Sequence, residues 1–167
     1  MAAAPANILA KNRRVMEAVS KTIHHVESDV GMGQTVKACL QSLTGSIFSG
    51  TFKPAALAAK VGISGDVLFD VVSSSGVGCG ITNTALENII DRKFEGNGSH
   101  INTMHKDLTI SLNMAEELEV PLLTVSTAIQ IFHAGKSKHP NGDNWACTQV
   151  NEEIIGAELP RNLGGKS

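Results

Sequence analysis

Apolar residues recur at helical spacing through most of this chain. One stripe runs through Val36, Cys39, Leu40, Leu43 and Ile47, and a longer one through Ile101, Met104, Leu108, Leu112, Ala115 and Leu118. Residues at such spacing share one face of an α-helix. Aromatic residues, on which β-sheets rely, make up only 4% of the 167 residues, with no Tyr. The pattern therefore predicts a mainly α fold.

Local signals divide residues 31–156 into six or seven helices. Pro54 lacks a backbone N–H and is expected to interrupt the first helix, so that a second one runs on to Val61. Ser64 is a predicted N-cap for the next helix, and Asp143 for the last one, which ends at 155. The other predicted helices span 83–91, 101–118 and 122–132, with a glycine- and serine-rich loop at 73–80 and a polar loop at 135–142.

The first thirty residues differ from the rest. A short helix is expected over 11–20 and a strand over 22–27, without a second strand to pair with it. A lone strand is not stable by itself. We therefore expect residues 1–30 to be the remnant of an upstream domain, 31–156 to form a helical domain, and 157–167 to be a flexible tail.

Composition narrows the classes of function. The net charge of −2 argues against a nucleic-acid-binding surface. The longest apolar runs fall short of the roughly 18 residues of a membrane span. Three widely spaced cysteines suit reduced thiols in a cytoplasmic protein. The six histidines lack the spacing of metal ligands, so we expect no metal site.

The stretch Gly31-Met-Gly33-Gln-Thr-Val-Lys37 follows the predicted strand and opens a helix. Val36 occupies the position of the third glycine of a dinucleotide-binding fingerprint, and also that of the glycine before the lysine of a Walker A loop. The stretch therefore matches neither motif. The glycines still allow close approach of a ligand, and free N–H groups at a helix start favour an anion. Lys37 lies in the first turn, with Gln41 one turn further on the same face. Spacing alone leaves two interpretations of Lys37 open: a proton donor to a carbonyl oxygen, or a solvated surface lysine.

Three motifs, in this order, resemble the C-terminal half of the β-hydroxyacid dehydrogenase family, which includes hydroxyisobutyrate dehydrogenase. The first is Gly31-x-Gly33-x-x-x-Lys37. The second is Met104-His-Lys106-Asp107-Leu108 with the later Val120-Pro121-Leu122, and the third is Gly142-Asp143-Asn144-Trp145-Ala146. The resemblance covers roughly residues 7–156.

This resemblance implies a two-domain enzyme. An N-terminal Rossmann domain would bind NAD or NADP, and a helical domain of the phosphogluconate dehydrogenase C-terminal type would close over it. Lys37 would be the catalytic acid and base acting on a small hydroxyacid, with Gln41 beside it in the catalytic site. Gly31 and Gly33 would shape the substrate pocket, and Lys106 would reach the cofactor.

Some residues depart from the family pattern. Gln41 replaces the usual asparagine, and Lys53-Pro54 replaces Glu-Ala. An alternative is therefore a non-catalytic helical module for dimerisation or interaction. In either case we expect a homo-oligomer formed through the helical domain, because apolar surface is left exposed. We also expect the isolated chain to lack activity, because the cofactor loop of the family would lie before Met1.

Overall fold

The N-terminal unit, Met1–Gln41, is built on two parallel strands joined by a helix. Strand β1 (Ala2–Ala3) pairs with β2 (His25–Glu27), and α1 (Ala6–Val19) connects them. The Ala2 N–H donates to the His24 carbonyl at 2.8 Å, and the Ala4 N–H to the Glu27 carbonyl at 2.9 Å. The expectation that β2 has no partner is therefore wrong. Two alanines are too short a run to show the alternation by which a strand is recognised in a sequence.

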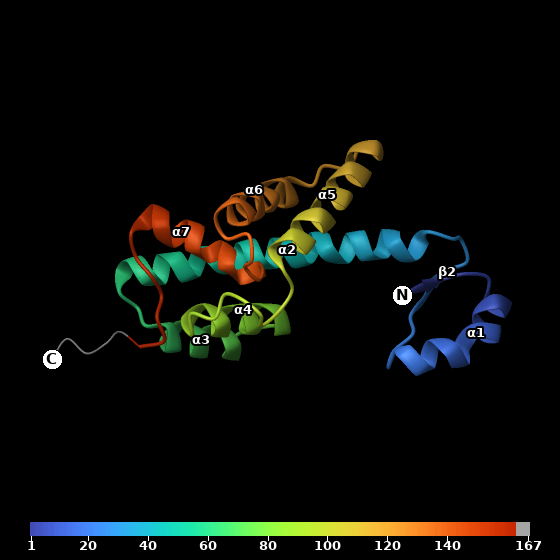
Figure 1. Ribbon diagram of the computed structural model, residues 1–167, viewed down its shortest axis with the longest axis horizontal. Helices are drawn as coiled ribbons and strands as arrows, with labels where there is room; N and C mark the ends of the chain where they lie inside the picture. The colour runs from blue at the N-terminus through green and yellow to red at the C-terminus, as the bar shows by residue number, and fades with distance from the viewer. Residues whose placement is uncertain (163–167) are drawn as a thin grey trace. The chain divides into compact units, whose positions relative to one another are not determined.

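The second unit, Ser42–Ser167, is helical, and the computed structural model describes it as far as residue 162. Helix α2 (Met32–Val61) begins in the first unit and continues into the second (Figure 1). The remaining elements are α3 (Gly65–Ser74), α4 (Gly80–Ile90), α5 (Ile101–Glu117), α6 (Leu123–Lys138), the 3-10 turn η1 (Asn144–Cys147) and α7 (Thr148–Ile155). The predicted mainly α fold of six or seven helices, preceded by a short αβ segment, is confirmed.

The two units divide after Gln41, beyond the boundary expected at residue 30. The start of α2 lies against the strand segment: a Cβ added to Gly33 would lie 3.5 Å from the Met1 carbonyl oxygen. The first turns of α2 therefore pack with residues that precede them in the chain.

The main core of the second unit joins α2, α4, α5, α6 and η1. Phe48, Phe52 and Phe132 form an aromatic group whose ring centroids lie 6.2–6.3 Å apart. Trp145 is 3% exposed, and its indole N–H donates to the Lys93 carbonyl at 2.7 Å. The predicted stripe of α5 is largely buried here, through Ile101, Met104, Leu108 and Ala115.

Helix α2 differs from its prediction in two ways. It runs without a break through Pro54. Pro54 has no N–H to donate to the Gly50 carbonyl, but both residues lie at the exposed side of the helix, where water can replace the missing hydrogen bond. The predicted stripe also faces outward: Leu40 is 52% exposed and Leu43 is 58% exposed. The buried face is the opposite one.

Two other helix boundaries differ from those predicted: the end of α6 and the start of α7. Helix α6 continues through the expected loop as far as Lys138, because Gly135 packs closely on Cys147: a Cβ there would lie 2.5 Å from the Cys147 sulfur. The Asp143 side chain does not cap the last helix. It accepts a hydrogen bond from the Asn97 backbone N–H at 2.7 Å, and η1 precedes α7. Ser64 does cap α3, accepting from the Val67 N–H at 3.5 Å.

Residues 157–162 are packed, in contrast to the expected flexible tail. Leu159 is 1% exposed and lies in a second apolar cluster with Ala55, Ala58, Leu86 and Ile90. The Pro160 carbonyl accepts from the Gly65 N–H at 3.0 Å and so satisfies a donor at the start of α3. Residues 163–167 of the expected tail lie outside the described residues.

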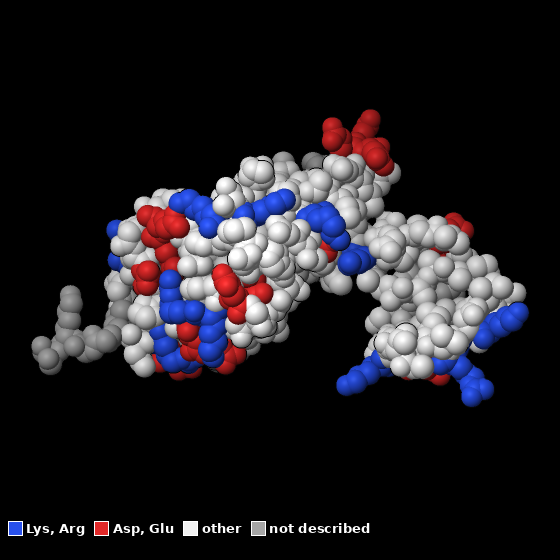
Figure 2. All heavy atoms as spheres, in the orientation of Figure 1, with Lys and Arg blue, Asp and Glu red and all other residues white. Residues whose placement is uncertain are grey.

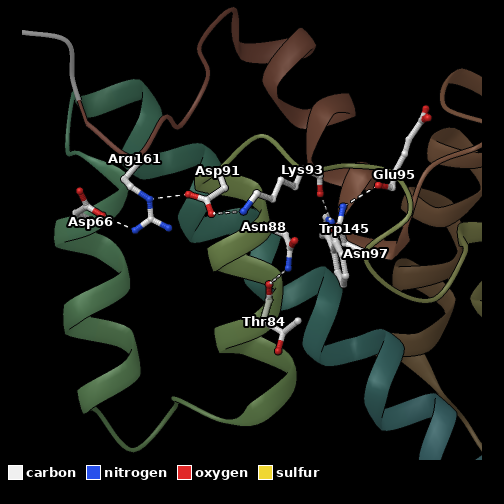
Figure 3. A network of polar contacts seen from close by, with 9 residues as sticks. All are labelled: Asp66, Thr84, Asn88, Asp91, Lys93, Glu95, Asn97, Trp145 and Arg161. Carbon is white, nitrogen blue, oxygen red and sulfur yellow. Dashed lines mark hydrogen bonds and ion pairs between the residues drawn. The ribbon is translucent and has the colours of Figure 1, made fainter.

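Arg161 ties α3 to the end of α4. Its Nε donates to Asp91 Oδ1 at 2.6 Å, and its Nη1 to Asp66 Oδ1 at 2.9 Å (Figure 3). Lys93 approaches the other oxygen of Asp91 at 3.0 Å. The hydrogen bond from Arg161, and then that from Lys93, lower the pKa of Asp91 to about 2.

Charged side chains of both signs are interspersed on the visible face of the second unit, with an acidic group over the C-terminal end of α5 (Figure 2). Within residues 1–162, no helix has the length and apolar character needed to cross a membrane.

We predict that Leu159→Ala lowers the free energy of unfolding by about 2–3 kcal/mol, because it opens a cavity in the second cluster. Denaturant unfolding would measure this. Leu123→Ala is the control, since Leu123 is 78% exposed and its truncation should change stability by less than about 0.5 kcal/mol. An equal, small effect of both variants would contradict the packing of residues 157–162.

We also predict a pH-dependent effect of Asp91→Asn. The ordinary pKa of an aspartate is about 3.9, so the ion pairs of Asp91 stabilise the folded state fully above that pH and are lost as the pH falls through about 2. Thermal unfolding from pH 7 down to pH 2 should show the wild type melting above the variant at neutral pH and the difference becoming much smaller as the pH approaches 2. A difference at pH 2 as large as that at pH 7 would contradict this.

Candidate functional site

A tight turn leads from β2 into α2. Gly31 has φ +104°, a conformation that residues with a side chain rarely adopt. Its carbonyl accepts from the Gln34 N–H at 2.8 Å and the Thr35 N–H at 3.2 Å, which starts the helix. Gly31 is therefore required for the turn that positions the first residues of α2.

A pocket of about 420 Å³ lies beside this turn, within the N-terminal unit. It is lined by Met1, Ala3, Val30, Gly31, Gly33, Gln34 and Lys37. Three of the predicted site residues, Gly31, Gly33 and Lys37, thus line one pocket. Sequence reasoning missed the other four. Met1 and Ala3 reach the pocket through the pairing of β1 with β2, for which the sequence carries no local signal.

The pocket suits a small anion. Lys37 is exposed and contributes an ammonium group, and the first turn of α2 contains no acidic residue. The positive end of the helix dipole adds to the attraction for a carboxylate. An ammonium in such a pocket can bind an acid group or exchange a proton with an oxygen atom nearby.

Gln41 lies one turn beyond Lys37 on α2 and is half-buried. Residues four apart on a helix lie on the same face. Its amide is therefore placed on the Lys37 side of the helix, where it can donate or accept a hydrogen bond.

Lys106 lies on α5 in the second unit. Its Nζ is 2.6 Å from Oδ1 of Asp107, a carboxylate that is itself only 5% exposed, whereas the Lys106 side chain is 59% exposed. A buried carboxylate needs such a partner. An ammonium has three N–H donors, so Lys106 can hold Asp107 and still offer donors to an anionic cofactor group such as a phosphate.

Other reactive groups lie elsewhere in the second unit. His105 and His133 approach each other at 3.4 Å, and burial, followed by the charge of Lys136, lowers the pKa of His105. All three cysteines are free; burial raises the pKa of Cys147 to about 12. Among residues 1–162, no group of three or more His, Cys, Asp or Glu side chains is arranged to hold a metal ion.

Comparison with known proteins supports the resemblance seen in the motifs. L-threonate dehydrogenase of Escherichia coli O6:H1 is 31% identical over 92% of this chain and 49% of its own length. The 2-(hydroxymethyl)glutarate dehydrogenase of Eubacterium barkeri is 26% identical over 95% of this chain and 53% of its own length. This chain therefore spans about half the length of these curated relatives.

A solved structure agrees with these matches. The crystal structure of 3-hydroxyisobutyrate dehydrogenase from Salmonella typhimurium superposes with a TM-score of 0.83 and 26% identity, over 90% of this chain and 53% of that one. The family described as "NAD-binding of NADP-dependent 3-hydroxyisobutyrate dehydrogenase" matches residues 31–150. Because that match covers most of the sequence, the chain belongs to this dehydrogenase family.

Proposed function

We propose that this chain is the catalytic-lysine part of an NAD(P)-dependent oxidoreductase that acts on a small hydroxyacid by hydride transfer. The observation that carries the proposal is the place of Lys37, which lines one pocket together with Gly31 and Gly33 at the start of α2. The pocket is about 420 Å³ in volume, a size that suits a small acid.

In this proposal the pocket binds the substrate through its carboxylate. The positive end of α2 and the open space beside Gly31 receive the acid group. In the oxidation direction, the Lys37 amine accepts the hydroxyl proton as hydride leaves the carbon. In the reverse direction, its ammonium returns a proton to the carbonyl oxygen. The nicotinamide cofactor, when bound, accepts or supplies the hydride.

Gln41 would orient the substrate from one turn along the helix. Its amide offers the same donor and acceptor as the asparagine common in the family, on a side chain one methylene longer. Pro54, the other departure from the family pattern, leaves α2 continuous. This continuity favours the enzyme over the alternative of a non-catalytic module.

Lys106 would hold the cofactor. Its ammonium would donate to a phosphate or hydroxyl oxygen, while the ion pair with Asp107 limits the directions in which the side chain extends. The remainder of the cofactor site would come from the half of the relatives that this chain does not match. We therefore expect negligible turnover by the chain alone, and the cytoplasmic location stays a prediction.

We predict that Lys37→Ala abolishes catalysis when the chain is joined to the nucleotide-binding half of its threonate dehydrogenase relative. The loss in kcat should be about 10²–10⁴-fold, the range for removal of a general acid or base. Oxidation of a panel of small hydroxyacids, with NAD and with NADP, would measure it. Lys53→Ala, an exposed lysine further along α2, is the matched control. Full activity of Lys37→Ala in this fusion would refute the catalytic role of Lys37.

We predict that small hydroxyacids bind the isolated chain at the start of α2. Titration with L-threonate or 3-hydroxyisobutyrate at millimolar concentration should shift the amide NMR signals of Gly31, Gly33 and Gln34. Lys37→Ala should weaken the binding severalfold, whereas Lys53→Ala should not. Shifts that cluster elsewhere, or are equal for an uncharged diol, would favour the non-catalytic module.

A further inference from the structure

Two histidine side chains meet at the surface where α5 and α6 pack together. His105 lies on α5 and His133 on α6, 28 residues further along the chain. His133 Nδ1 is 3.4 Å from His105 Nε2, and the two ring centroids are 5.5 Å apart. Neither residue lines the pocket of Lys37 or takes part in the ion pair of Lys106. Their approach therefore has no role in the function proposed above.

The separation of the two ring nitrogens is wide for a hydrogen bond. N–H···O hydrogen bonds in proteins are usually about 2.7–3.2 Å long. A zinc ion binds imidazole nitrogens at about 2.0–2.1 Å and prefers a tetrahedral arrangement, in which two such nitrogens lie about 3.3–3.4 Å apart. The 3.4 Å between the histidines therefore equals the spacing of two ligands of one zinc ion.

The main core of the second unit holds the two histidines in place. Met104 directly precedes His105 and is 4% exposed. Phe132 directly precedes His133 and is fully buried. Both of these neighbours belong to the main core, so the backbone under each histidine is fixed. A metal ion would find the two ligands already side by side, which lowers the entropy lost on binding.

Both rings can present a lone pair to the same ion. A neutral imidazole has one nitrogen without a proton, and that nitrogen is the one that binds a metal. Burial, followed by the charge of Lys136, lowers the pKa of His105, which favours its neutral ring. With zinc at His105 Nε2 and His133 Nδ1, the other nitrogen of each ring would carry the proton.

Two histidines leave two of the four positions of a tetrahedral ion open. No third His, Cys, Asp or Glu side chain among residues 1–162 joins the pair in a group that could hold a metal. Water would take the open positions, as it takes the fourth position of catalytic zinc sites. The ammonium of Lys136 works against a cation at this place. The site is therefore open and its metal exchangeable.

We propose that His105 and His133 form a binding site for a zinc ion, which links α5 to α6. The site is independent of the chemistry proposed for Lys37, so either proposal can fail without the other. The expectation of no metal site rests on spacing along the chain, and a pair that comes from two helices leaves no trace in that spacing.

Zinc titration of the full chain, without an added histidine tag, tests the proposal. A Cys39→Ser, Cys79→Ser background removes the two exposed thiols, which would also bind zinc. Calorimetry should show zinc binding in the micromolar range, and Mg²⁺, which prefers oxygen ligands, should not compete. In NMR spectra, the ring nitrogens of His105 and His133 should shift together. Ring signals that do not move at millimolar zinc would overturn the proposal.

Substitutions assign the binding to this pair. His133→Ala should weaken it at least about tenfold, because even partners outside the ligand shell are worth about 10–100-fold in metal affinity. His24→Ala, at an exposed histidine of the N-terminal unit, is the matched control and should leave the shifts of the pair unchanged. Lys136→Gln should strengthen binding, because it removes a nearby positive charge, and a damaged fold cannot produce that gain. Unchanged affinity in His133→Ala, or weaker binding by Lys136→Gln, would overturn the proposal.

Discussion

The burial of one face of helix α2 is the interaction on which the second unit depends. Phe48 and Phe52 are buried in the main core and so fix which side of this part of the helix faces inward. Ala55 and Ala58, further along the same helix, are buried in the second apolar cluster. One helix therefore takes part in both apolar clusters of the unit.

In the N-terminal unit, the turn at Gly31 sets the geometry of the candidate site. Its positive φ directs the chain from β2 into α2, and the pairing of β1 with β2 brings the first residues of the chain to the same place. The pocket beside Lys37 consequently has walls from two stretches of the chain, residues 1–3 and residues 30–37. The site is therefore a product of the pairing of β1 with β2 as well as of the motif.

Much of the helical fold could be predicted from the sequence, because α5 has one apolar face and α3 has a clear N-cap. Helix α2 could not, since both of its faces are apolar and periodicity does not say which is buried. Strand β1 and the packing of Leu159 also lack a local signal, because each depends on a partner distant in the chain. At the site, Gly31, Gly33 and Lys37 could be predicted from their motif. The ion pair between Lys106 and Asp107 joins sequence neighbours, but the burial of the Asp107 carboxylate depends on tertiary packing and has no signal in the sequence.

Which of the two apolar faces of α2 is buried follows from the size and shape of the side chains on each face. Aromatic side chains bury more area than leucine and gain further from ring contacts, and Phe48 and Phe52 meet Phe132 of α6 in such contacts. The small residues Ala55 and Ala58 then let α4 and Leu159 approach the same side of the helix. Leu43 and Leu57, on the exposed side of α2, have no such complement within the unit, and Pro54 leaves a carbonyl on that side without its helical donor. The side of α2 that lacks the hydrogen bond between Pro54 and Gly50 is thus the side that stays exposed in the second unit.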